Sequence, residues 1–209
     1  MKASVLAAFL KFTAPLEGRV PWMYLDDASP RGLVTCGVGN LCSLSFALTL
    51  PWTVDGRRAT RAEIEAAWRA VDAAQARKHQ GGGNHGDLTR LRLSDTDIDA
   101  MVMAKVRGNE AELCKVFPAF SSWPADAQLF ACSWAWAVGP HGRYPKMIAL
   151  LNKGDFEGAR KEATINPQRG TIVLRNKRNL QLLRNAAIVQ EQGLDFEVLH
   201  WPEALERAA

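Results

Sequence analysis

The sequence predicts an α+β protein that is mainly helical and carries one small β-hairpin near its start. Residues 3–16 show an apolar stripe with helical spacing, whereas residues 22–38 are rich in aromatic and β-branched residues around a turn-forming run. From residue 60 onward the helical patterns return. With 209 residues, 47% of them hydrophobic, we expect one domain with a substantial core over residues 1–209.

The first helix is expected over residues 3–16 and to end near Pro15, which leaves Glu17 just past it. A carboxylate gains nothing from the C-terminal end of a helix dipole. Its position therefore indicates a role other than stabilising the helix.

The hairpin follows, with Trp22 and Tyr24 on the first strand and a turn over residues 26–32. Gly37 and Gly39 would weaken the second strand, so we expect a ligand or a neighbouring element to approach the backbone there. A tight bulge without a ligand is the alternative.

A capping box formed by Thr60 and Glu63 predicts the start of the next, amphipathic helix. The glycine-rich run 80–86 after it is expected to be a flexible loop. His79 and His85 lack the spacing of metal ligands, so we expect no zinc site, and nothing in the sequence requires an organic cofactor.

Ser94 opens another helix, and residues 123–139 predict a buried central helix. Core packing is the simpler expectation for Trp134 and Trp136, because large rings on a central helix are usually buried. For Arg175 a solvated basic helix is one interpretation; the other is that it braces the acid-bearing region, because an Arg fork can hold a carboxylate or a backbone carbonyl in fixed geometry, and we expect a structural role.

Glycoside hydrolysis needs one protonated carboxyl group and one ionised carboxylate, and Glu17 and Asp26 could fill these roles. The pattern Glu-Gly, Tyr-x-Asp, Gly-x-x-Thr-x-Gly-x-Gly over residues 17–39 resembles the active-site region of the phage-type lysozymes, or endolysins, a glycoside hydrolase family that includes pesticin-like muramidases. The resemblance implies that Glu17 is the general acid and that Asp26 and Thr35 position the attacking water. Trp22 or Tyr24 would supply the apolar wall that keeps Glu17 protonated.

Thr35 comes three residues later than in the short family pattern, which we interpret as a longer turn through residues 28–30. This insertion leaves Asp27 open as an alternative to Asp26. The resemblance further implies substrate contacts from Tyr24, Gly37, Gly39, Asn40 and Trp136. Asn40 stands where many members have a histidine, and Ala137 where they present an amide, which Ser133 or Trp136 would replace.

The family pairs a small β-containing lobe with a larger helical lobe that flank a cleft. Here this implies a lobe over about residues 17–50 and a helical lobe over about residues 59–209, on which the first helix packs. The segment 42–93 is longer than in the smallest members, and we interpret it as a tolerated insertion or as a substrate or partner surface.

The implied function is a peptidoglycan muramidase that hydrolyses the β-1,4 bond between N-acetylmuramic acid and N-acetylglucosamine and so lyses the cell wall. A catalytically inactive module of the same fold, binding peptidoglycan or a protein partner, is the first alternative. A lytic transglycosylase is the second, although Asp26 would then have no role.

The net charge of +4 favours an anionic polymer as partner, and bacterial peptidoglycan fits it. No nucleic-acid-binding motif accompanies the charge, so we expect no nucleic acid as partner. No apolar run is long enough for a membrane span. We expect a monomer, and an immunity or delivery protein stays open as a partner.

Residues 1–12 resemble a signal peptide only superficially, because no cleavage site precedes Glu17. We therefore expect synthesis in the cytoplasm and action in the periplasm or on the cell wall after release or secretion. The four cysteines, at positions 36, 42, 114 and 132, are expected to be buried thiols, with a Cys36–Cys42 bridge as the alternative in an oxidising compartment.

Overall fold

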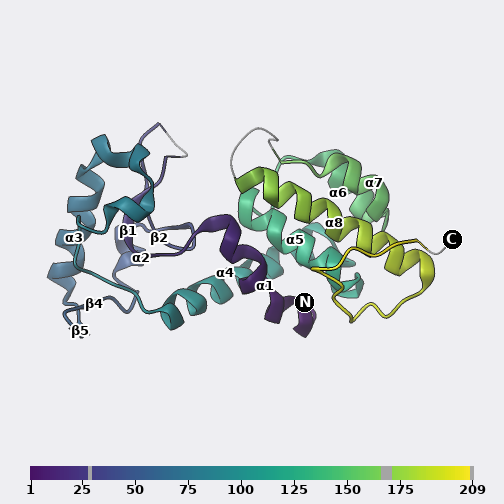
Figure 1. The fold of residues 1–209 in the computed structure, drawn as a ribbon, viewed down its shortest axis with the longest axis horizontal. Helices are drawn as coiled ribbons and strands as arrows, with labels where there is room; N and C mark the ends of the chain where they lie inside the picture. Colours follow the sequence, from purple (N-terminus) through teal and green to yellow (C-terminus); the bar gives the residue numbers. More distant parts are fainter. Residues whose placement is uncertain (28–29, 166–170, 208–209) are drawn as a thin grey trace. The chain divides into compact units, whose positions relative to one another are not determined.

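The computed structural model describes residues 1–27, 30–165 and 171–207, and in this part of the chain the predicted α+β class is confirmed. Figure 1 shows a mainly helical chain with a small amount of β-structure. The α-helices are α1 (Ala3–Glu17), α2 (Leu44–Ala47), α3 (Arg61–Ala73), α4 (Asp95–Val116), α5 (Ala125–Val138), α6 (Pro145–Asn152), α7 (Phe156–Glu162) and α8 (Thr171–Gln192). The strands are β1 (Val20–Leu25), β2 (Val34–Gly37), β3 (Asn40–Leu41), β4 (Thr53–Val54) and β5 (Arg57–Arg58), and short 3-10 helices are η1 (Gln75–Gln80), η2 (Gly82–His85) and η3 (Phe120–Ser122).

The chain divides into two compact units, and their boundaries differ from the lobes that the sequence suggested. One unit comprises Glu17–Val102, here called the β-containing unit, and the other comprises Met1–Leu16 with Met103–Ala209, the helical unit. Residues 59–102 were expected with the helices but belong to the β-containing unit, because α3 packs on β1 and β2.

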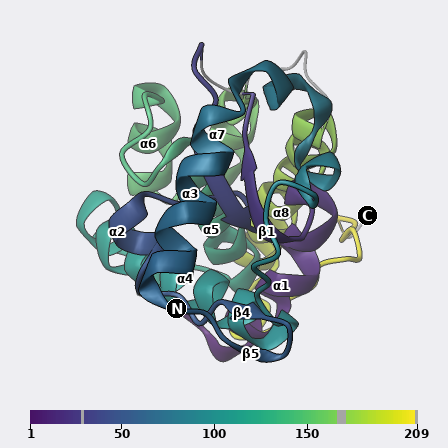
Figure 2. The same cartoon turned by 90° about the vertical axis from the view of Figure 1, so that its left-hand side faces the viewer.

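The β-containing unit is built on an antiparallel sheet in the order β1-β2-β3. Tyr24 lies opposite Thr35, Leu25 lies opposite Val34, and an irregularity separates this pairing from that of Val20 with Gly37. Helix α3 lies beside the sheet in Figure 2 and contacts both longer strands. The suggested lengthening of the turn falls on residues 28–30, of which 28 and 29 lie outside the described residues.

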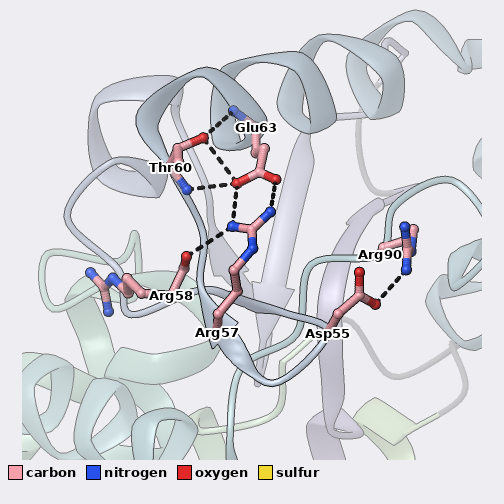
Figure 3. Close-up of polar contacts among 6 residues, drawn as sticks. All are labelled: Asp55, Arg57, Arg58, Thr60, Glu63 and Arg90. Atoms are coloured by element: carbon pink, nitrogen blue, oxygen red, sulfur yellow. Dashed lines mark hydrogen bonds and ion pairs between the residues drawn. The ribbon is translucent and has the colours of Figure 1, made fainter.

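The segment after the sheet contains a second, two-stranded hairpin of β4 and β5. Its turn uses Asp55 at φ +50° and Gly56 at φ +79°, the left-handed pair that a two-residue hairpin favours. The capping box predicted for α3 is present, since Thr60 accepts a hydrogen bond from Glu63 N–H and the Glu63 carboxylate accepts one from Thr60 N–H. Figure 3 shows the Arg57 guanidinium on the same carboxylate.

The helical unit is organised around α5, whose residues from Ala125 to Trp136 are all buried. This confirms the predicted central helix, which packs on α8 and ends at Val138, where Gly139 with φ +83° caps it. Helix α1 packs its aromatic face in the same unit, with Phe12 at 5.1 Å from Trp201 between ring centroids. It runs through Pro15 to Glu17, so the expected end before Glu17 was wrong by one residue.

Within the described residues, none of the helices combines the length and apolar character that crossing a membrane would require.

Candidate active site in the β-containing unit

Glu17 is the last residue of α1, and Gly18, at φ +70°, turns the chain away from the helix towards β1. The Glu17 side chain is half-buried. A Cβ atom added to Gly39 would lie 3.2 Å from Glu17 Oε2, so the carboxyl group lies against the backbone at this glycine. Gly39 also has φ +65°, which makes glycine doubly suited to the position.

Asp26 and Thr35 lie close together at the turn end of the first hairpin, and the Leu33 backbone contacts both. The Asp26 N–H donates to the Leu33 carbonyl at 3.1 Å, and the Leu33 N–H donates to Asp26 Oδ1 at 3.2 Å. The buried Thr35 hydroxyl lies 3.0 Å from the same carbonyl and 3.5 Å from Asp26 Oδ2. Asp26 is half-buried while Asp27 is exposed, so the geometry favours Asp26 over Asp27 as the second carboxylate.

Tyr24 lies within electrostatic reach of both candidate acids. Burial raises the pKa of its phenol well above the ordinary value, and electrostatic interactions with Cys36 and with the carboxylates of Glu17 and Asp26 raise it further. A hydrogen bond from the Gly39 backbone acts in the opposite direction but is outweighed. The phenol therefore stays protonated, and it interacts electrostatically with both Glu17 and Asp26.

Gly37 and Asn40 face a neighbouring element rather than an open space. A Cβ atom on Gly37 would lie 3.4 Å from Asn40 Nδ2 and 3.6 Å from side-chain atoms of Ile98 and Met101, both on α4. Asn40 is buried, and its Nδ2 has no hydrogen-bond partner among the described residues. The distances at Gly37 are ordinary van der Waals distances, whereas Gly37 has φ +64°, so its backbone conformation and not close packing accounts for glycine at this position.

Trp136 belongs to the helical unit and has the contacts of a core side chain. It is 7% exposed, its ring centroid lies 5.6 Å from that of Phe9, and Lys105 Nζ lies 4.0 Å from its centroid. Ser133 is fully buried, and Arg175 donates to its carbonyl at 3.0 Å and to its hydroxyl at 3.1 Å. Arg175 is buried, so a solvated basic helix is ruled out at this position, and its guanidinium holds a backbone carbonyl of α5 within the helical unit.

The thiols differ from the expectation at one position. Cys36, Cys42 and Cys132 are free and buried, but Cys114 is exposed on α4. A hydrogen bond with the Cys42 thiol, followed by burial, raises the pKa of Cys36 far above its ordinary value. No group of three or more His, Cys, Asp or Glu side chains in the described part of the chain has a geometry that could hold a metal ion.

Two contributors to this site were missed in the sequence. The Leu33 backbone forms hydrogen bonds with both Asp26 and Thr35. Because any residue type has these backbone groups, the sequence could not reveal this role. His85 is fully buried and accepts a hydrogen bond at Nδ1 from the Leu25 N–H, between Tyr24 and Asp26. His85 is 60 residues from Leu25 along the chain, so no local sequence pattern predicts this contact.

No protein-family model matches this chain, and a search of the curated proteins by sequence finds no match.

Proposed function

We propose that this protein is a peptidoglycan muramidase, and that it hydrolyses the β-1,4 bond between N-acetylmuramic acid and N-acetylglucosamine. The observation that carries the proposal is the grouping of Glu17, Asp26 and Thr35 around Tyr24 in one compact unit. Glycoside hydrolysis uses a pair of carboxyl groups, one as acid and one as base, and Glu17 and Asp26 are the two carboxyl groups of this grouping. The motif over residues 17–39, which resembles that of the phage-type lysozymes, supports the same assignment.

In the proposed reaction Glu17 donates its proton to the glycosidic oxygen as the C1–O bond breaks. Asp26 and the Thr35 hydroxyl hold a water molecule, whose oxygen bonds to C1 while Asp26 takes its proton. The products are a sugar with a free reducing end and a sugar with a free hydroxyl group, with inversion at C1. The Leu33 backbone fixes Asp26 and Thr35 relative to each other, which lowers the entropic cost of placing the water.

The charge distribution supports an anionic polymer as substrate. The helical unit has 16 basic and 11 acidic residues, whereas the β-containing unit has 10 basic and 11 acidic residues. Peptidoglycan carries peptide carboxylates, so the basic excess would draw the protein to the wall. We propose that the protein acts as a monomer in the periplasm or on the wall, after cytoplasmic synthesis.

The test is lysis of purified peptidoglycan by the wild type beside Glu17→Gln, with Glu162→Gln, an exposed glutamate of α7, as matched control. We expect clearing by the wild type and the control, and none by Glu17→Gln with an unchanged circular dichroism spectrum. Mass spectrometry of the released muropeptides should show reducing ends.

Three results would contradict the proposal. Lysis by Glu17→Gln would remove Glu17 from the role of acid. Anhydro ends on the muropeptides would indicate a transglycosylase. If wild-type protein sediments with the wall without clearing it, the protein is a binding module.

A further inference from the structure

We propose that the glycine-rich segment Gly81–Gly86 is a buttress that positions Tyr24 and the end of β1, and that Gly82 and His85 are positioning residues of the proposed active site. The inference rests on the proposed muramidase function only for its catalytic consequence. The sequence suggested a flexible loop here, and this expectation was wrong, because the segment forms η2 and is hydrogen-bonded along β1.

The first contact is steric, between Gly82 and the Tyr24 ring. A Cβ atom on Gly82 would lie 2.6 Å from Tyr24 Cδ2 and 2.8 Å from Cγ, distances that real Cβ atoms essentially never show. Gly82 does not have a positive φ, so glycine is required here by space and not by backbone conformation. The backbone of η2 therefore lies directly on the ring whose phenol is near Glu17 and Asp26.

The second contact is with Trp22, two residues before Tyr24 and so on the same side of β1. Trp22 Nε1 donates to the Gly82 carbonyl at 2.9 Å, and a Cβ atom on Gly86 would lie 3.1 Å from the Trp22 ring. Arg92 donates to the Gly86 carbonyl at 2.9 Å, and its Cζ lies 4.9 Å from the centroid of the same ring. The segment is thus held over two successive aromatic rings of one strand.

The third contact fixes the strand itself. His85 Nδ1 accepts the Leu25 N–H at 3.1 Å, and His85 Nε2 lies 2.9 Å from the Arg77 carbonyl. Only the neutral ring with its proton on Nε2 satisfies both bonds. Arg77 in turn binds the Asn84 carbonyl and both oxygens of the Asp87 carboxylate.

These contacts act together on one short stretch of backbone. Because β1 is at the edge of its sheet, its outer N–H groups have no strand partner among the residues that the structure describes, and His85 takes that place at Leu25. Leu25 lies between Tyr24 and Asp26, so a displacement of η2 would move both. A small misplacement of a reacting group is enough to lower the rate of an enzyme strongly.

The test compares Gly82→Ala with Gly83→Ala, its neighbour in η2. A Cβ atom on Gly83 meets nothing within 4 Å, and Gly83 has no positive φ, so this substitution controls for an added methyl group in the same turn. The chain has two tyrosines, so both variants are made on Tyr144→Phe, in which phenolate absorbance reports Tyr24 alone. At a pH of about 11, where an ordinary tyrosine is ionised, we expect Tyr24 to stay protonated in the parent and in Gly83→Ala.

In Gly82→Ala the ring must move away from η2, and we expect Tyr24 to ionise at a lower pH because it loses burial. If Tyr24 ionises at the same pH in Gly82→Ala and in Gly83→Ala, the proposal that Gly81–Gly86 positions Tyr24 is wrong. If Gly82→Ala fails to fold, Trp22→Phe replaces it, since it removes the Nε1 bond to Gly82 and keeps an aromatic ring. A Tyr24 titration unchanged in that variant would overturn the proposal equally.

The catalytic consequence is measured separately, on peptidoglycan. We expect Gly82→Ala to lose roughly tenfold or more in kcat while it still sediments with the wall, and Gly83→Ala to match the parent. A shifted Tyr24 titration with unchanged lysis would overturn the positioning role. If the parent itself does not lyse the wall, the proposed function fails, whereas the Tyr24 titration still decides the buttress.

Discussion

The Thr35 hydroxyl and the Asp26 carboxylate lie 3.5 Å apart and are both held by the backbone of Leu33, whose N–H donates to Asp26 Oδ1 and whose carbonyl accepts from the Thr35 hydroxyl. The strand register produces this arrangement, since Tyr24 opposite Thr35 brings Asp26 opposite Leu33. Position and orientation of the two side chains are therefore set before any substrate binds. Preorganisation of this kind favours the placement of one water molecule.

The first prediction separates Asp26 from Asp27, which the sequence could not do. Asp26→Asn should lower wall lysis at least about a hundredfold, because the water loses its base. Asp27→Asn should leave lysis within about twofold of the wild type, because the Asp27 side chain is exposed. Initial rates of turbidity loss at matched protein concentrations measure both variants, and a greater loss in Asp27→Asn would reverse the assignment.

The parts of the fold that are encoded locally were predictable. The capping box of Thr60 and Glu63 needs only residues three apart, and the buried helix α5 follows from a long apolar run after Pro124. The contacts of the site are of another kind. Gly82 on Tyr24 joins segments almost sixty residues apart, and a sequence shows such a contact only as a glycine without an evident turn.

The second prediction concerns the thiols. Native protein should react with maleimide at Cys114 alone, since it is exposed while the other three thiols are buried. Burial raises the pKa of Cys132 to about 12, which also keeps that thiol protonated and unreactive. Mass spectrometry should find one label on native protein and four after denaturation. Rapid labelling of Cys36 or Cys42 in native protein would contradict the packing of β2 and β3.

The third prediction uses the charge cluster drawn in Figure 3. The Arg57 guanidinium, followed by the Thr60 groups, lowers the pKa of Glu63 from its ordinary value of 4.5 to about 2. A carboxylate with a lowered pKa in the folded state stabilises the protein above its ordinary pKa, and this contribution is lost as pH falls through about 4.5 towards 2.

Glu63→Gln keeps a side chain that can reach the Thr60 N–H but removes the charge. Urea unfolding should therefore find it less stable than the wild type at pH 7, with a difference that shrinks as the pH approaches 2. Arg57→Gln should give the same trend, and the double variant should add little to either. A difference that is constant with pH would show that the ion pair contributes nothing.

The fourth prediction has the opposite sign and concerns Asp126, which is fully buried at the start of α5. Its carboxylate accepts hydrogen bonds from Asn185 Nδ2 at 2.9 Å, from His200 N–H at 2.9 Å and from Trp201 N–H at 3.2 Å, and so ties the C-terminal segment to α5 and α8. Burial nevertheless outweighs these bonds and raises the pKa of Asp126 above its ordinary value of 3.8.

A raised pKa in the folded state means that the native protein binds this proton more tightly than the unfolded chain does. The stabilisation is complete below pH 3.8 and is lost as the pH rises from there through the raised value. The free energy of unfolding of the wild type should therefore fall relative to that of Asp126→Asn as the pH rises from about 3.5 to 7, because the variant cannot titrate there. Urea titrations at four or five pH values give this difference directly. A wild type that gains stability over the variant across the same range would show that the hydrogen bonds from Asn185, His200 and Trp201, and not burial, control the charge of Asp126.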